Sequence, residues 1–242
     1  MHMGSLRAQA PIVATIALAI IGSVLPCSGA ITMPGWSAPE LSVPPHTEVQ
    51  WVARTMRLNG VPMAVRTIQS RLEPAALFDY YEAQARGSGS NEYRRSSHGE
   101  WLLLAIKSPS LYTTFQLRRT VAGCEGTVTS TPLPIPHATG MTSEFPRPST
   151  SRIVSLQEYD DDGVRSEHIS LLSTHSAAVE SRAFAEQLSR LGWSILRHES
   201  MQQVAAGFVI EAQHGAQQAM LTLQPDRLQA TLTAIVVVWS KP

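Results

Sequence analysis

The sequence predicts an α+β protein made of two similar lobes, each with a β-hairpin, one helix and three to four antiparallel strands. The first observation is a pair of hairpin signals, Asn59-Gly60 and Asp162-Gly163, each between two strand-like runs. The second is that Pro74 lies 14 residues after the first turn and Ser176 lies 13 after the second, each at a helix start. The third is a series of strand-like runs after each helix. This shared order of parts suggests an internal duplication.

The hairpins are predicted from the turns and from the runs beside them. Asn-Gly and Asp-Gly suit two-residue hairpin turns because both central residues need a positive φ. The flanking strands are expected at residues 49–58 and 61–70 in the first lobe, and at 152–161 and 164–172 in the second.

Both helices carry recognisable start signals. Pro74 suits the first turn of a helix because its missing N–H has no intrahelical partner there. The second helix is expected over 176–192, with Ser176 or Thr174 as its N-terminal cap and Gly192 as its end.

Further strands follow each helix. Alternation of apolar and polar residues, as in 219–225, is typical of antiparallel strands with one buried side. The remaining expected strands are 91–95, 100–108, 111–120 and 125–133 in the first lobe, and 193–200, 207–214, 219–225 and 228–239 in the second.

Two proline-rich segments divide the chain. Residues 31–48 are interpreted as an extended lead-in outside the core, and residues 135–151 as a linker. Prolines at this density remove backbone donors and sustain neither a helix nor a sheet. The first lobe is therefore expected at 49–134 and the second at 152–242.

The start of the chain has the three parts of a secretory signal peptide, expected at residues 1–30. Arg7 gives a short positive start, residues 11–25 form an apolar core, and small residues up to Ala30 offer a cleavage site. The apolar core is shorter than the ~20 residues that span a bilayer. The signal indicates an exported, periplasmic or envelope-associated protein. The arginine and alanine content of the whole chain, together with this leader, suits a Gram-negative bacterium.

Cys27 raises the question of lipid attachment. Pro26 stands directly before it, where a lipoprotein signal normally has a small residue, and proline fixes φ and lacks an N–H. We therefore expect cleavage after Ala30, with lipid attachment at Cys27 and retention of the leader as an anchor as alternatives.

Composition narrows the class of partner. Nineteen lysines and arginines balance nineteen aspartates and glutamates, so no basic face for nucleic acid is predicted. Beyond the leader the chain keeps one cysteine, Cys124, which cannot form an internal disulfide. It is interpreted as a small residue beside a glycine turn.

No catalytic or metal-binding constellation is apparent. The sequence has no HExxH, no Cys-x-x-Cys and no Gly-x-Ser-x-Gly elbow. The acidic run 160–162 is explained by the second hairpin turn and lacks the spacing of a calcium loop. We therefore predict no catalytic residues, no metal and no cofactor.

Five residues are candidates for binding. Trp36, an aromatic residue in the proline-rich lead-in, could dock onto a partner. The pairs Arg94 with Arg95 and Arg118 with Arg119 form the local basic concentration of the chain and could meet an acidic partner.

Together these observations favour a non-enzymatic binding or scaffold protein in a membrane-associated assembly such as a secretion or pilus system. Recognition is expected through protein partners at exposed sheet edges, with 49–58 and 228–239 as candidate edges, and through the proline-rich segment. Residues 228–239 are too apolar for an uncovered strand, so this strand is expected to be either central or covered by a partner. Two alternatives are a small-ligand or glycan-binding protein with a cleft between lobes, and a hydrolase with a dispersed site.

Overall fold

The computed structural model describes residue 36 and residues 38–89, 92–134, 141–161, 164–201, 207–226, 228–229 and 231–241 of the chain. We call the described residues up to 134 the first half and those from 141 the second half. The predicted signal peptide and Cys27 lie outside the described residues, as do residues 135–140 of the predicted linker.

Each half contains two strands, a helix and four further strands. The first half has β1 (Thr47–Leu58), β2 (Val61–Ser70), α1 (Pro74–Gly87), β3 (Glu92–His98), β4 (Trp101–Lys107), β5 (Leu111–Thr120) and β6 (Gly123–Pro132). The second has β7 (Ser151–Asp161), β8 (Val164–Ser173), α2 (Ala177–Arg190), β9 (Ser194–Ser200), β10 (Phe208–His214), β11 (Gln217–Pro225) and β12 (Thr233–Lys241). The last strand begins at Thr233, later than expected.

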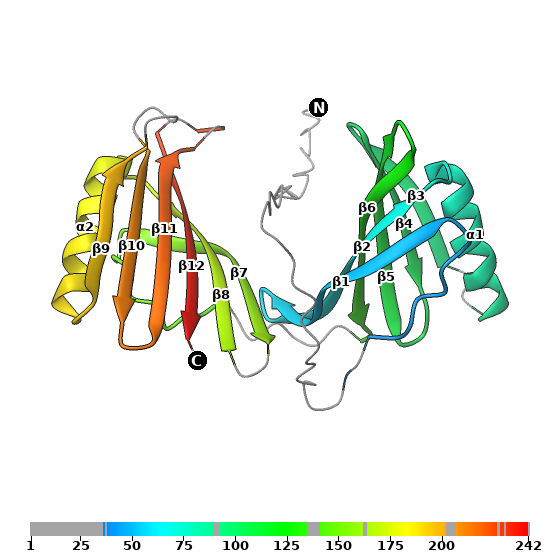
Figure 1. The fold of residues 1–242 in the computed structure, drawn as a ribbon, viewed down its shortest axis with the longest axis horizontal. Coiled ribbons are helices and arrows are strands. Elements are labelled where there is room, and N and C mark those ends of the chain that lie inside the picture. The colour runs from blue at the N-terminus through cyan, green and yellow to red at the C-terminus, as the bar shows by residue number, and fades with distance from the viewer. Residues whose placement is uncertain are drawn as a thin grey trace, which may run out of the picture.

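The twelve strands form one antiparallel sheet in the order β3-β4-β5-β6-β2-β1-β7-β8-β12-β11-β10-β9. Both helices lie on the outer flanks of the molecule, and the ribbon has the outline of a V (Figure 1). The fold is thus α+β but dominated by β-structure.

This strand order corrects the predicted sheet edges. The strand predicted at 49–58 is β1, which lies inside the sheet between β2 and β7. The strand predicted at 228–239 corresponds to β12, which lies between β8 and β11. Of the two alternatives for this apolar strand, the structure shows the central one. The outer strands of the sheet are the exposed β3 and β9.

One sheet continues through both halves, so the structure gives no evidence of two separate lobes. Met56, Arg57 and Leu58 of β1 pair with residues 157–159 of β7. This short ladder lies at the base of the V (Figure 1). Where domains begin and end along the chain stays a prediction.

The first predicted turn is confirmed. Asn59 and Gly60 have φ angles of 52° and 79°, and Leu58 pairs with Val61 across the turn. Both central residues therefore adopt the left-handed conformation of a two-residue hairpin turn. In the second hairpin β7 and β8 are paired up to Asp161 and Val164, and the turn residues 162–163 lie outside the described part.

The predicted starts of both helices and the predicted end of the second are also confirmed. The Ser176 side chain accepts a hydrogen bond from the Val179 backbone N–H, as an N-terminal cap does. Gly192 follows the end of α2 with a φ of 84°, a backbone conformation that favours glycine. Pro74 occupies the first turn of α1.

Buried side chains form two hydrophobic clusters, one under each helix. In the first half Tyr81 of α1 stacks on Phe115 of β5, with ring centroids 4.2 Å apart. In the second half Phe184 and Leu188 of α2 pack against the strands of that half.

The described parts of both proline-rich segments contact these clusters, which corrects the view of the lead-in as separate from the core. Phe145 is buried, and its ring centroid lies 5.9 Å from Trp193 and 5.5 Å from Trp239. Leu41 packs against the first cluster. Proline density excludes regular structure but does not keep the apolar residues between the prolines from being buried.

Candidate functional site

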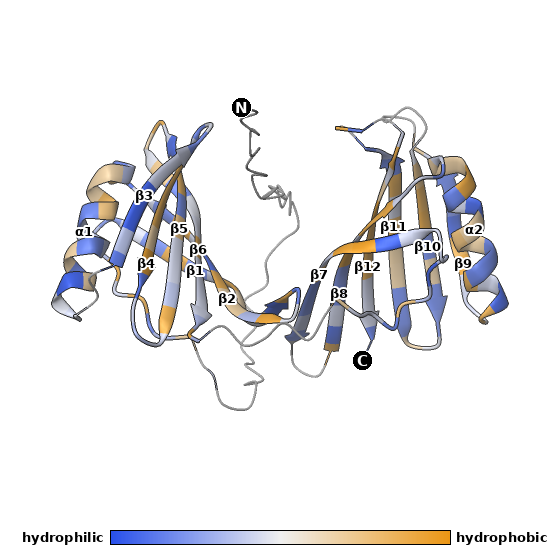
Figure 2. Ribbon diagram, turned by 180° about the vertical axis from the view of Figure 1, so that it is seen from behind, coloured by the Kyte–Doolittle hydropathy of each residue, from blue (hydrophilic) through white to orange (hydrophobic). Residues whose placement is uncertain are grey.

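A broad surface of the sheet has no helix on it. Along β2, Ala64, Arg66, Ile68 and Ser70 are buried, whereas Thr67 and Gln69 are exposed. Hydrophobic and hydrophilic residues alternate along strands of both halves (Figure 2). Successive side chains of a strand point to opposite sides of the sheet. Thr67 and Gln69 therefore lie on the face that no helix covers, which we call the helix-free face.

In the first half this helix-free face carries hydroxyl and amide side chains. Thr67 of β2 pairs with Thr127 of β6, and Thr127 pairs with Gln116 of β5. Thr114 and Thr129 form a second such row. Paired residues have neighbouring side chains on the same face, so this surface offers hydrogen-bonding groups, together with the paired charges of Arg118 and Glu125.

In the second half the same face carries exposed apolar side chains between polar ones, since Met220 also pairs with Glu211 of β10, which contacts Arg197. Met220 of β11 pairs with Val238 of β12, while Val236 of β12 pairs with Thr222. Met220 and Val236 are 46% and 44% exposed. We call Met220, Val236, Val238 and the neighbouring Val209 of β10 the apolar patch. The sequence analysis missed it, although the unusual apolar content of the last strand was the signal that could have revealed it.

His168 of β8 borders the apolar patch, since it pairs with Val238. Its ring centroid lies 5.0 Å from that of Tyr159, whose hydroxyl donates to Gln157. Burial lowers the pKa of His168 below its usual value, and burial raises the pKa of Tyr159. Both groups are therefore uncharged at neutral pH, in keeping with an apolar surface.

The four predicted arginines do not form one patch, because neighbouring strand residues point to opposite faces. On β3, Arg95 contacts Glu82 and Asp79 of α1, with an Nε to Oε1 distance of 2.6 Å to Glu82. These carboxylates raise the pKa of Arg95. Arg94 is exposed and makes no ion pair with a described residue.

The second pair, on β5, is divided in the same way. Arg118 contacts Glu125 across the sheet at 2.6 Å and lies over the Trp101 ring, 5.4 Å from its centroid. Arg119 contacts Glu73, next to the helix, at 3.3 Å. Binding through these arginines stays a prediction, and three of the four already have carboxylate partners.

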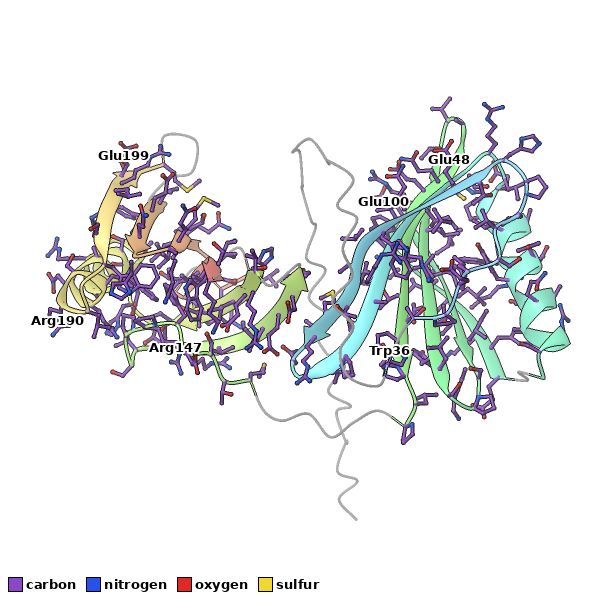
Figure 3. The ribbon with its side chains drawn as sticks, turned by 60° about the horizontal axis from the view of Figure 1, so that its bottom comes forward. Trp36, Glu48, Glu100, Arg147, Arg190 and Glu199 are labelled. Carbon is purple, nitrogen blue, oxygen red and sulfur yellow. The ribbon has the colours of Figure 1, made fainter. Side chains whose placement is uncertain are left out.

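Trp36 lies on the side of the first half (Figure 3) and is partly buried. It is therefore less available than the freely exposed aromatic residue that the sequence suggested. Its role in docking stays a prediction.

Cys124 is buried at the start of β6. Burial, together with the nearby Glu73 carboxylate, raises the pKa of its thiol to about 11. The reactive form of cysteine is the thiolate, so this environment suits a structural residue, as the sequence analysis expected.

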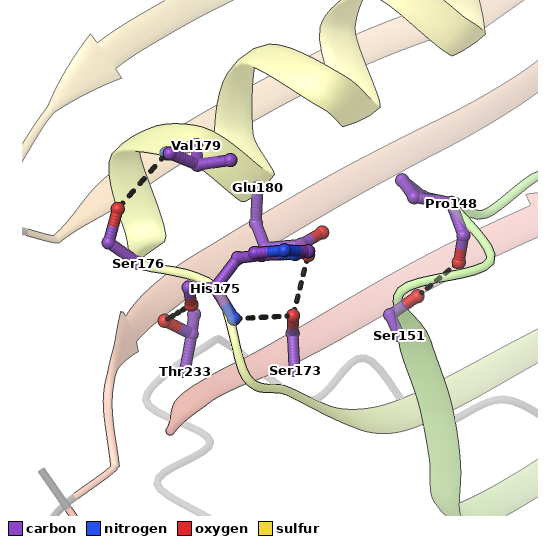
Figure 4. A network of polar contacts seen from close by, with 8 residues as sticks. All are labelled: Pro148, Ser151, Ser173, His175, Ser176, Val179, Glu180 and Thr233. Atoms are coloured by element: carbon purple, nitrogen blue, oxygen red, sulfur yellow. Dashed lines mark hydrogen bonds and ion pairs between the residues drawn. The ribbon is translucent and has the colours of Figure 1, made fainter. Parts of the chain in front are cut away.

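A serine, a histidine and a glutamate meet where β8 leads into α2 (Figure 4). Ser173 Oγ donates to Glu180 Oε1 at 2.5 Å, and His175 Nδ1 lies 3.2 Å from the same oxygen. In a catalytic triad the serine hydroxyl contacts the histidine, whereas here it contacts the carboxylate and is buried. The network therefore fixes the start of α2, where Ser173 Oγ also accepts from the His175 N–H.

Among the residues that the structure describes, no group of three or more His, Cys, Asp or Glu side chains is placed to hold a metal ion. None of the helices described is both long enough and apolar enough to cross a bilayer.

Comparisons with known proteins give little additional information. No protein-family model matches the sequence, and no curated protein matches it. One similar solved structure is the apo structure of immunity protein TplEi of T6SS from Pseudomonas aeruginosa. The match covers 83% of each chain at 12% sequence identity, with a TM-score of 0.31. A TM-score this low does not establish a shared fold.

Proposed function

We propose that this protein is an exported, non-enzymatic component of a Gram-negative cell envelope that binds a protein partner. It would act as a scaffold or accessory part of a membrane-associated assembly such as a secretion or pilus system. The helix-free face, rather than the strands first expected at the sheet edges, would carry the interaction.

The observation that carries this proposal is the exposed apolar patch. Large apolar side chains grouped on a surface are characteristic of interaction sites. Met220 and Val236 are exposed on strands whose other face is fully buried, so core packing does not explain them. The hydroxyl-rich part of the face in the first half would provide hydrogen bonds to the same partner.

The test is co-purification from the envelope of the native host with surface variants. Met220→Asp and Val236→Asp place a charge in the apolar patch and should remove the specific partner seen with the wild-type protein. Val179→Asp is the matched control, because Val179 is 53% exposed on α2, away from the patch. Circular dichroism should show that all three variants fold. Recovery of the same partner with all of them would reject the proposal.

The cellular location is part of the proposal and has its own test. Intact-mass analysis of the protein from the envelope fraction should give a mass beginning at Ile31. A mass beginning at a lipidated Cys27 would make the protein a lipoprotein and the proline-rich segment its tether.

We further propose that the halves arose by duplication and form two domains. The strand order β3-β4-β5-β6-β2-β1 in the first half corresponds to β9-β10-β11-β12-β8-β7 in the second. The two helices have 14 residues each. Limited proteolysis between 134 and 141 should then leave two fragments that retain secondary structure, and rapid degradation of both would argue against two domains.

A further inference from the structure

Arg66 is a buried charged residue that the proposed partner surface does not use. It lies on β2, on the side of the sheet that faces α1, and is only 3% exposed. Burial lowers its pKa, but an arginine remains charged at any physiological pH. Burying a cation is unfavourable unless a partner compensates it, so its surroundings require an explanation.

The described residues provide no carboxylate partner within ion-pair distance of Arg66. Its guanidinium lies over the ring of Trp51, 3.8 Å from the centroid, and Nη2 donates to the Pro39 carbonyl of the lead-in. Arg54 lies over the same ring at 4.9 Å, and its charge lowers the pKa of Arg66 further. Glu40 raises the pKa of Arg66 by more than Arg54 lowers it, but forms no ion pair with it. Arg66 is therefore balanced by one nearby carboxylate that does not contact it.

A second buried group near Arg66 lacks a hydrogen-bond partner among the described residues. Tyr81 of α1 is 3% exposed, and its hydroxyl makes no hydrogen bond with any described residue. Leaving a buried hydroxyl unpaired costs about 1–3 kcal/mol, so such groups usually have a bonding partner in the functional state.

The sheet register places these two groups over the same row of side chains, with Val128 between them. Phe115, Val128 and Arg66 pair across β5, β6 and β2, so their side chains lie in a row on one face. Tyr81 stacks on Phe115 at the end of this row. Its hydroxyl is within electrostatic range of the Arg66 guanidinium, and each influences the pKa of the other.

We propose that Arg66 and the Tyr81 hydroxyl form a buried binding site for a carboxylate group, covered by Pro39 of the lead-in. A guanidinium and a phenol hydroxyl can donate to the two oxygens of one carboxylate, and charge-assisted bonds of this kind are strong. Trp51 would hold the guanidinium plane in place by stacking. This site lies on the opposite side of the sheet from the apolar patch, so the inference is independent of the proposed function.

The equivalent position in the second half supports a specialised role for Arg66. The hairpin strand β8 carries the buried Ile169 at the place that matches Arg66, since β2 and β8 begin at Val61 and Val164. The fold of the second half is therefore compatible with an apolar residue at this position. A buried arginine is present here in the first half alone.

The experiment measures thermal unfolding of the full chain in sodium acetate and in sodium chloride at equal ionic strength. Wild-type protein should melt about 5 °C higher in acetate when the site is saturated. Tyr81→Phe removes only the unpaired hydroxyl, so it should fold normally in chloride and lose most of the acetate effect. Tyr80→Phe is the matched control and should keep it, because the Tyr80 hydroxyl bonds to Ser42 instead.

An equal acetate response of wild-type protein and Tyr81→Phe would overturn the proposal, as would the absence of any acetate response. A larger response to inorganic phosphate than to acetate, lost in Tyr81→Phe, would also overturn it, since the oxyanion would then be a phosphate. Arg66→Met, which keeps the length of the side chain, should abolish the response if it folds. If Arg66→Met does not fold, the comparison of Tyr81→Phe with Tyr80→Phe still tests the proposal.

Discussion

Asn59 and Leu156 join the two halves of the sheet by a reciprocal pair of hydrogen bonds. The Asn59 N–H donates to the Leu156 carbonyl at 2.8 Å, and Asn59 Oδ1 accepts from the Leu156 N–H at 2.9 Å. Asn59 also needs the positive φ of the turn. One residue therefore closes the first hairpin and extends the ladder between β1 and β7 beyond its last backbone pair.

Replacing the Asn59 side chain should weaken this junction. Asn59→Gly keeps the backbone conformation but leaves the N–H of the buried Leu156 without an acceptor, at a cost of about 1–2 kcal/mol in the free energy of unfolding. Asn59→Asp is the control, because it keeps an acceptor oxygen and tolerates positive φ. Urea denaturation of both variants provides the comparison. Equal stability of the two would show that the side-chain bond contributes nothing.

Phe145 should behave as a core residue despite its proline-rich surroundings. It contacts Trp193 and Trp239, so Phe145→Ala should lower the free energy of unfolding by about 3–5 kcal/mol. Met141→Ala, in the same segment but at an exposed position, should change it by less than about 0.5 kcal/mol. Thermal melts of both variants measure the difference, and similar small effects would return the segment to the status of a linker.

The Cys124 thiol should be protected and should make stability depend on alkaline pH. Its folded pKa of about 11 exceeds that of an unfolded thiol, so the unfolded chain loses this proton first as pH rises. The stabilisation of the folded state by this protonated thiol is fully present below the pKa of the unfolded thiol. It is lost as the pH rises toward 11. In a Cys27→Ser background, iodoacetamide at pH 8 should modify Cys124 only after denaturant is added. Rapid modification of the native protein would contradict this.

The Ser173 and Glu180 pair should show strong coupling. Ser173→Ala removes a donor from a buried carboxylate, one oxygen of which already lacks a described partner, and should cost about 1–3 kcal/mol. Leu77 occupies the matching helix position in α1, so Ser173→Ala with Glu180→Leu should recover most of that loss. A double-mutant cycle measures the coupling. Additive effects would show that the two residues act independently.

Features fixed by neighbouring residues could be predicted from the sequence, whereas those that depend on distant pairing could not. The Asn59 turn and the Ser176 cap depend on a few adjacent residues, and both are present. The positions of β1 and β12 inside the sheet depend on pairing with β7 and β8, which are distant along the chain. Hydrophobic periodicity does not contain that information, so 49–58 was wrongly predicted as an edge, whereas the apolar content of 228–239 did indicate a central position as one alternative.

The same distinction holds for the candidate sites. Strand alternation predicts that Arg94 and Arg95 point to opposite faces, but it does not predict the contacts of Arg95 with α1. The apolar patch requires the register of three strands, which places Met220 beside Val238. Arg66 was missed because a single arginine in a strand normally indicates a solvent-exposed position, and only the sheet register places it beside Tyr81.

The insertion of β12 between β8 and β11 has a consequence for the order in which the chain matures. A chain is synthesised from its N-terminus, so most pairings among β1 to β6 can form before the later strands are made. In the second half, β8 and β11 stay apart until residues 233–241 arrive to bridge them. Until then β8 and β11 each expose an apolar flank that is prone to aggregation. The second half is therefore the part for which a chaperone would matter most, and its dependence on the nine residues of β12 makes the arrival of that strand the step that commits this half to its shape.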